Sequence, residues 1–116
     1  MFGFRKEINP FSVSDKVRFR NIDRTITMEV RSEAAIMVNR LTRAQAMLAK
    51  LNEDSDEEES RKIALDFAGA IFGEKQANDL LSFYDDEPLA VIGACGKYFQ
   101  ERLGKIITKA QKREKK

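Results

Sequence analysis

The 116-residue sequence predicts a mainly α-helical domain of about four helices with a β-hairpin at its N-terminal end. Two observations carry this prediction. From Met37 onward, apolar residues recur at spacings of three and four, which is the period of an amphipathic helix. Between residues 16 and 30, apolar and polar residues alternate instead, as they do in a half-buried strand. The length fits one domain with a modest core, and we place that domain at residues 16–110.

The N-terminal residues 1–15 show neither period, and we expect them to form a flexible arm. The arm is rich in phenylalanine for a chain end. Phe2 and Phe4 are therefore candidate partner-binding residues, as an apolar arm that inserts into a neighbouring molecule.

Residues 16–30 predict the hairpin. Val17 and Phe19 alternate with basic residues on the first strand, and a turn follows around Ile22 and Asp23. An isolated two-stranded hairpin is only marginally stable in water, so it must pack on the helices or on another copy. The apolar positions of the second strand are Ile26, Met28 and Val30.

A long helix is expected next, capped by Ser32. Its apolar face is the strongest periodic signal in the chain and comprises Met37, Leu41, Ala44, Leu48 and Leu51. Residues 52–59 are then mostly acidic, and like charges at this density favour an open loop. The loop lacks the central glycine and the twelfth-position glutamate of a calcium-binding EF-hand.

Three further helical patterns follow with short connections. Gly73 is expected to end the first of them, and Pro88 to occupy the first turn of the third. The residues expected to be largely buried across all helices are Leu41, Leu48, Phe67, Leu80, Ile92 and Phe99. The last helix presents Ile92, Cys95, Phe99, Leu103, Ile106 and Ala110 on one face and runs into a basic tail at 111–116.

The position of Phe83 on the second of these helices fits two different roles. Leu80, Leu81 and Tyr84 define its apolar face, and Phe83 lies about 60° from the centre of that face. Phe83 is therefore either a partly exposed aromatic residue that binds a partner or a member of the core. We take Phe83 and Tyr84 as candidate partner-binding residues together with the two phenylalanines of the arm.

Composition excludes several classes of function. The chain has no histidine, which removes the commonest general base and metal ligand. Its one cysteine, Cys95, lies on an apolar helical face, where a small buried hydrophobe is expected. The acidic run Asp85-Asp86-Glu87 is more simply explained by the field at a helix N-terminus than by a cation. We expect no enzyme, no cofactor and no metal.

Location and partners are constrained by the same composition. No apolar run approaches the roughly 18 residues that span a bilayer. The N-terminal residues show no continuous apolar stretch followed by a small-residue cleavage site, so we do not expect secretion. A single cysteine excludes an internal disulfide and fits a reducing compartment, so we expect a cytoplasmic protein. We expect no membrane partner. The acidic loop and the basic C-terminal end carry opposite charges, which can direct self-association. Arg18, Arg20 and Arg24 could contact phosphates, but the near balance of 21 basic and 19 acidic residues makes nucleic acid an alternative only.

One segment resembles a known family. The residues Ile71-Phe72-Gly73-Glu74, Ala77-Asn78, Leu80-Leu81, Phe83-Tyr84-Asp85, Pro88 and Leu89 resemble the tail assembly chaperones of long-tailed phages and prophages of Gram-positive bacteria. The similarity extends over residues 16–116 and is most specific between Phe72 and Leu89.

The resemblance implies a non-catalytic role in the bacterial cytoplasm. Proteins of this family coat the aggregation-prone tape-measure protein until tail-tube subunits polymerise around it. The expected partners are therefore the tape-measure protein, with the tail-tube protein as a further candidate, and a second copy of the chain. The alternatives are another phage structural protein, such as a head–tail connector component, and a small nucleic-acid-binding regulator.

Overall fold

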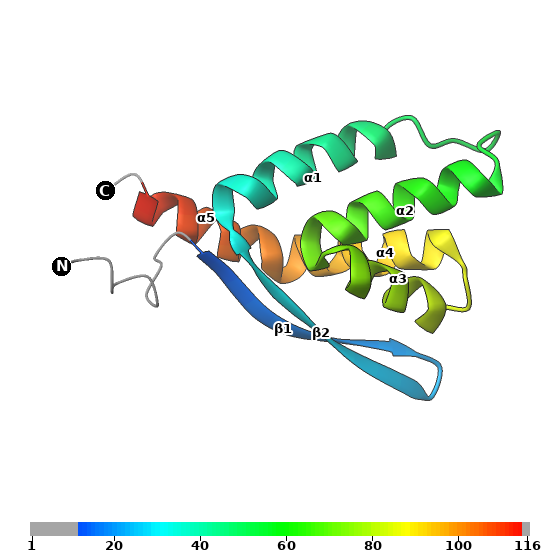
Figure 1. Cartoon of the computed structure of the whole chain (residues 1–116), viewed down its shortest axis with the longest axis horizontal. Helices are drawn as coiled ribbons and strands as arrows, with labels where there is room; N and C mark the ends of the chain where they lie inside the picture. The colour runs from blue at the N-terminus through cyan, green and yellow to red at the C-terminus, as the bar shows by residue number, and fades with distance from the viewer. Residues whose placement is uncertain (1–11, 115–116) are drawn as a thin grey trace.

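The structure, a computed structural model, describes residues 12–114, with side chains described from 12 to 112. Its mainly helical character and N-terminal hairpin confirm the predicted fold class, with 65% of the described residues in helices. In chain order, the elements of Figure 1 are β1 (Ser12–Asn21), β2 (Arg24–Glu33), α1 (Ala34–Leu48), α2 (Glu57–Phe72), α3 (Glu74–Phe83), α4 (Pro88–Tyr98), η2 (Phe99–Leu103) and α5 (Gly104–Glu114).

Helix α2 lies at the centre of the helical part, where it packs against α1, α3, α4 and β2. The molecule is elongated, with principal extents of 54 × 31 × 23 Å. Figure 1 shows that α5 and the start of β1 lie at one end of the long axis, while the hairpin turn and the α1–α2 and α3–α4 connections lie at the other. This division into two ends matters for the surfaces described below.

The hairpin is longer than the sequence pattern indicated. Residues 12–15 belong to β1 and residues 31–33 to β2, so the expected boundaries of the arm and of the hairpin at 16 and 30 are both wrong. The two strands pair in register from Ser12 opposite Glu33 to Asn21 opposite Arg24. The face against the helices carries Val13, Phe19, Met28 and Val30, all buried. Phe2 and Phe4 lie outside the described residues.

The start of α1 corrects a second prediction. Ser32 is part of β2, and Glu33 occupies the N-cap position without a side-chain hydrogen bond. The strand therefore passes directly into the helix. The expected hydroxyl cap is replaced by packing of Ala34 and Met37, both fully buried, which stabilises this junction.

The acidic block is only partly a loop. Helix α2 already begins at Glu57, because the Asp56 carboxylate accepts a hydrogen bond of 2.7 Å from the Glu59 amide. An aspartate at the N-cap satisfies one of the free amides, and acidic side chains in the first turn are favoured by the helix dipole. The expected loop at 52–59 therefore ends three residues early.

The α2–α3 corner follows the prediction for Gly73. This residue has φ 88° and ψ 162°, a conformation that is essentially restricted to glycine. It ends α2 and begins α3 at once, so the two helices meet without a loop. Pro88 also lies in the first turn of its helix, as expected.

The last helix changes its face at a π-helical segment. The sequence pattern assumed an unbroken α-helix, but η2 contains i→i+5 turns, which insert one extra residue. The face buried along α4, η2 and α5 therefore comprises Val91, Cys95, Tyr98, Leu103, Ile107 and Ala110. The predictions that Ile92 and Phe99 are largely buried are wrong for this reason, since both are only half-buried. Leu48, next to the end of α1, is also only half-buried.

An aromatic cluster joins the hairpin to the helices. Phe19 of β1 meets Phe72 of α2 edge to face, with 5.7 Å between ring centroids, and Tyr98 of α4 stacks on Phe72 at 6.0 Å. The Tyr98 hydroxyl donates a 2.7 Å hydrogen bond to the carboxylate of Asp15, which also pairs with Arg102. These contacts therefore fix β1 against α2, α4 and η2.

Candidate functional site

Of the predicted partner-binding aromatics, the two that lie within the described residues, Phe83 and Tyr84, do not form an exposed patch. Phe83 is 9% exposed, so the possibility that it projects as a free aromatic side chain is wrong and the core alternative holds. The guanidinium of Arg24 lies 5.4 Å from its ring centroid. Tyr84 is half-buried, and its hydroxyl donates to the Arg20 carbonyl at 3.2 Å.

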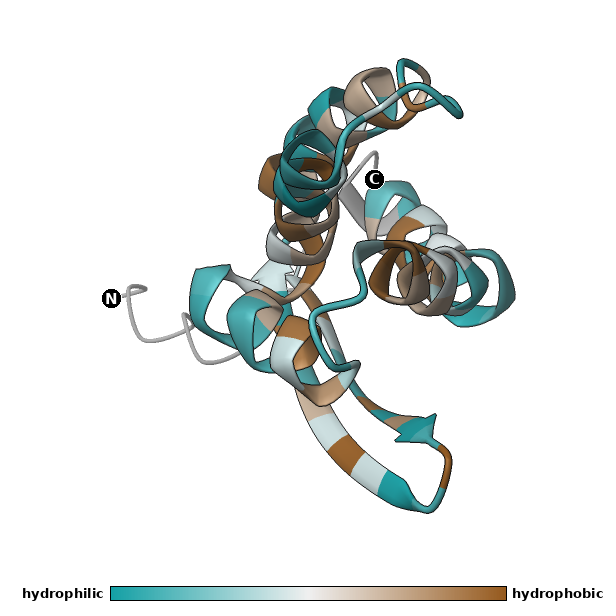
Figure 2. Cartoon of the chain, turned by 90° about the vertical axis from the view of Figure 1, so that its right-hand side faces the viewer, coloured by the Kyte–Doolittle hydropathy of each residue, from teal (hydrophilic) through white to brown (hydrophobic). Residues whose placement is uncertain are grey.

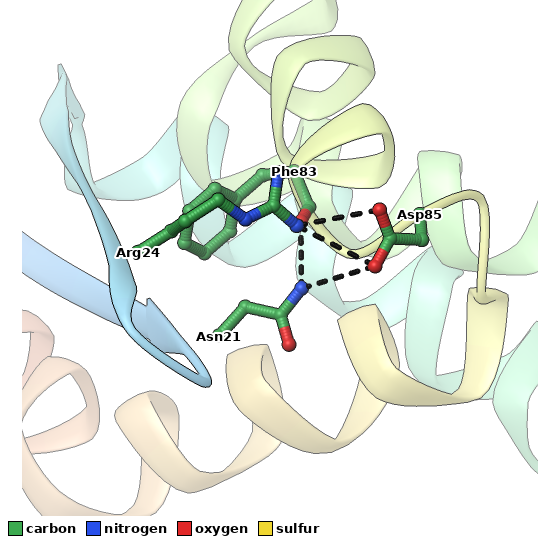
Figure 3. A network of polar contacts seen from close by, with 4 residues as sticks. All are labelled: Asn21, Arg24, Phe83 and Asp85. Atoms are coloured by element: carbon green, nitrogen blue, oxygen red, sulfur yellow. Dashed lines mark hydrogen bonds and ion pairs between the residues drawn. The ribbon is translucent and has the colours of Figure 1, made fainter.

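A clamp holds the hairpin turn against the end of α3, as Figure 3 shows. The Phe83 carbonyl accepts hydrogen bonds of 2.9 Å from both the Asn21 amide and the Arg24 guanidinium. Arg24 also pairs with the Asp85 carboxylate at 3.3 Å. A carbonyl at a helix C-terminus lacks an intrahelical partner, so these donors satisfy a group that would otherwise be free.

Asp85 and Asp86 serve this corner and not the start of α4. Both have positive φ, at 58° and 59°. The Asp86 amide donates to the Leu81 carbonyl and the Asp85 amide to the Ser82 carbonyl, which is the Schellman pattern that ends a helix. Asp86 also pairs with Arg61 of α2 at 3.5 Å. Of the acidic run that was expected to serve the N-terminus of the next helix, Glu87 alone occupies the N-cap position of α4, without a side-chain hydrogen bond, whereas the two aspartates bond to α3 and α2.

Several residues of the segment that carries the family resemblance have structural roles. Phe72, Ala77 and Leu80 are buried, Gly73 turns the chain, and Phe83 receives the hairpin. Leu89, in contrast, is 63% exposed. The segment also contributes Gly73, Glu74, Ala77 and Asn78 to the lining of a surface groove.

One candidate surface is a groove of about 740 Å³ between α1, α2 and the start of α3, here called the α1–α2 groove. The apolar residues that line it are either small or half-buried. The polar residues that line it are exposed and include both acidic and basic side chains. The apolar residues are Ala44, Met47, Leu65, Gly69, Ala70 and Ala77, and the polar residues are Arg40, Arg43, Lys62, Asp66, Glu74 and Asn78.

A second groove of about 710 Å³ lies between α1 and the η2–α5 part of the last helix, here called the α1–α5 groove. Its apolar lining includes Val38, Leu41, Phe99 and Ile107. Among the described residues that line it, the charged ones are all lysines, namely Lys105, Lys109 and Lys112. The spacing of four and three places these lysines on one face of α5.

Sequence patterns missed most of these lining residues because they lie beside the apolar stripes and not on them. Met47 adjoins Leu48, and Leu65 follows two buried residues of α2. Each is half-buried, as expected at the margin of an apolar face. The sequence feature that could have indicated these lining residues is the presence of apolar residues next to a helical stripe, which broaden it.

The solvent face of the hairpin bears on the nucleic-acid alternative. Lys16, Arg18 and Arg20 alternate along β1 and are exposed, with Arg31 on the same face of β2. Acidic residues interrupt this face, since Glu29 stands opposite Lys16 in the strand register. Arg24, which the sequence placed with the phosphate-binding candidates, is instead engaged by the clamp.

The pKa values of Cys95 and Tyr98 are shifted because of their structural surroundings. Burial raises the pKa of the Cys95 thiol to about 12, so the thiol remains protonated at neutral pH and behaves as a buried hydrophobe, as expected. Burial, and then the hydrogen bond to Asp15, raise the pKa of Tyr98. Neither group faces the two grooves.

Comparisons of the chain with family models, with curated proteins and with solved structures found no match. Within residues 12–114, no helix combines the length and the apolarity needed to cross a membrane. In the same part of the chain, no three or more cysteine, aspartate or glutamate side chains are grouped so that they could hold a metal ion.

Proposed function

We propose that this protein is a non-catalytic tail assembly chaperone of a long-tailed phage or prophage, which acts in the cytoplasm of the bacterial host. Its client is the tape-measure protein, and the tail-tube protein is a further partner. The resemblance between Phe72 and Leu89 supports the family, and the surfaces of the helical layer support the mode of binding. The observation that carries the proposal is the α1–α2 groove.

The groove fits a helical client for three physical reasons. Among its small lining residues, Gly69 is only half-buried and leaves room for the backbone of a bound helix to approach, while Ala44 and Ala77 are buried beneath it. Met47 adds a flexible, polarisable side chain that adapts to different apolar partners. The rim carries acidic and basic side chains, which suits amphipathic helices of varied sequence. Docking of an apolar helix face into such a groove is a common mode of recognition.

A chaperone must also release its client. Arg40, Arg43 and Lys62 on the rim are exposed, so their contacts with a client are screened by solvent and contribute little affinity each. The apolar lining is shallow, with Met47 and Leu65 only half-buried. Weak and reversible binding along a long client is the expected result.

Co-expression with the tape-measure protein of the same gene cluster tests the proposal. The wild-type protein should keep that protein in the soluble fraction, while the double variant Met47→Glu/Leu65→Glu should lose most of this effect. Both positions are half-buried in helices, so glutamate should be tolerated there by the fold. Circular dichroism and thermal melting should show a folded variant.

Ile36→Glu is the matched control, because Ile36 is a 42%-exposed apolar residue of the same helix α1 that lines neither groove. It should solubilise the client as the wild type does. A wild-type protein that neither binds nor solubilises the tape-measure protein would overturn the chaperone assignment. A folded groove variant that works as well as the wild type would show that the client binds elsewhere.

A further inference from the structure

The hairpin turn presents an apolar side chain in an unfavourable backbone conformation. Ile22 has φ 60°, in the left-handed region, and it is 86% exposed. Left-handed backbone is costly for a β-branched residue, whereas Asn, Asp and Gly adopt it readily. An exposed isoleucine gains no burial within its own chain to offset that cost. Strain of this kind in an exposed turn motivates a search for a contact outside the chain.

The turn is held rigidly in spite of this strain. Asn21 and Arg24, on either side of it, are both bonded to the Phe83 carbonyl, and the Arg24–Asp85 pair adds a further contact. Figure 2 looks onto this end of the molecule, with the hairpin turn at the bottom of the view. A fixed apolar side chain loses little conformational entropy on binding. The turn is therefore preorganised as a projecting contact.

The opposite end of the molecule carries a surface of matching chemistry. The α1–α5 groove offers apolar lining from Val38, Phe99 and Ile107, flanked by Lys105 and Lys109. An apolar residue with an acidic neighbour would complement it. Ile22 is followed by Asp23, which is exposed and has no ion pair within the described residues.

The charge of the two ends favours the same orientation. At the end with the hairpin turn, the three connections at 22–23, 49–56 and 84–87 contain one basic residue, Lys50. Their acidic residues are Asp23, Glu53, Asp54, Asp56, Asp85, Asp86 and Glu87, of which Asp85 and Asp86 are paired with Arg24 and Arg61. Helix α5 bears only lysines as charged residues between 104 and 112. Opposite fields at the two ends of an elongated molecule steer copies into a head-to-tail encounter.

We propose that the α1–α5 groove binds the hairpin turn of a second copy of this chain, with Ile22 against the apolar lining and Asp23 toward the lysines. The contact is heterologous, because the two halves lie on different surfaces of each copy. It therefore allows chains of copies to grow with concentration. It does not use the α1–α2 groove, so a client could be bound by each copy in such a chain.

Sedimentation velocity of the purified protein alone tests this contact over a range of concentrations. The wild type should form dimers and longer species that weaken as salt rises, because charge contributes to the contact. Ile22→Asn should raise the dissociation constant about tenfold or more through loss of the buried isoleucine. The same change should raise the melting temperature by about 2–5 °C, because asparagine tolerates the left-handed turn.

The opposite signs of these two effects separate a contact role from a folding defect. Lys105→Glu/Lys109→Glu should weaken association in the same way. Lys97→Glu, at an exposed lysine of α4 outside the groove, should associate as the wild type does. A mixture of Ile22→Asn with Lys105→Glu/Lys109→Glu should form a capped pair of two copies. In that pair the intact turn of the second variant occupies the intact groove of the first.

Three results would overturn the proposal. The first is a wild type that stays monomeric at high concentration in low salt. The second is an Ile22→Asn variant that associates as the wild type does. The third is a mixture of the two variants that remains monomeric. None of these depends on the tape-measure protein, so failure here is distinguishable from failure of the proposed chaperone function.

Discussion

Replacement of Phe67 by alanine should lower the free energy of unfolding by about 3–5 kcal/mol. Phe67 is 4% exposed and lies on α2, the helix that packs against α1, α3, α4 and β2. A cavity there removes contacts from the centre of the domain, where the surrounding helices are fixed by one another and cannot collapse to fill it. For a chain of this length, the melting temperature should fall on the order of 10–20 °C.

Chemical denaturation and thermal melting followed by circular dichroism measure this effect. Leu48→Ala provides the graded comparison, since Leu48 was expected in the core from its spacing but is only half-buried. It should cost roughly 1–2 kcal/mol, less than the Phe67 change. Leu89→Ala, at a leucine that is 63% exposed, should alter stability by no more than about 0.5 kcal/mol. Equal effects of all three changes would contradict the assigned core.

Gly73→Ala should destabilise the fold by about 1–3 kcal/mol, although the added methyl group would meet no atom within 4 Å. The cost comes from the backbone alone. At φ 88° and ψ 162° an L-residue is strained, and the direct junction of α2 with α3 leaves no loop to absorb a change. The two helices would have to reorient to relieve the strain.

The same substitution at Gly93 should have the opposite sign. Gly93 lies inside α4 with helical backbone, and a methyl group there also meets nothing within 4 Å. Alanine should therefore stabilise the helix by about 0.5–1 kcal/mol. Paired denaturant titrations of the two variants measure the difference. A stabilising Gly73→Ala change would contradict the conformation described for the α2–α3 corner.

Gly93 and Gly96 are small residues that do not mark a close contact in this fold. Glycines near Cys95 on a helical face are compatible with close approach of another segment, yet within the described part of the chain no other segment has an atom within 4 Å of a Cβ placed at Gly93 or Gly96. Sequence spacing shows that a residue is small. It does not show whether anything occupies the space that a larger residue would fill.

Local periodicity alone determined the element types of this protein. Alternation predicted the hairpin, and spacings of three and four predicted the helices. The special backbone of Gly73 and the position of Pro88 followed from the chemistry of glycine and proline. These features depend on a few neighbouring residues, so they can be predicted without knowledge of the fold.

Tertiary structure decided the faces and the surfaces. The π-helical segment moved the buried face of the last helix from Ile92 and Phe99 to Val91 and Tyr98, because Tyr98 packs on Phe72 and donates to Asp15. Phe83 became a core residue because the hairpin turn docks on the end of α3. Both grooves arise between helices distant in the sequence, and their lining residues are brought together only when α1 packs on α2 and α5. Such contacts depend on which distant segments pack together, and local periodicity does not specify that packing.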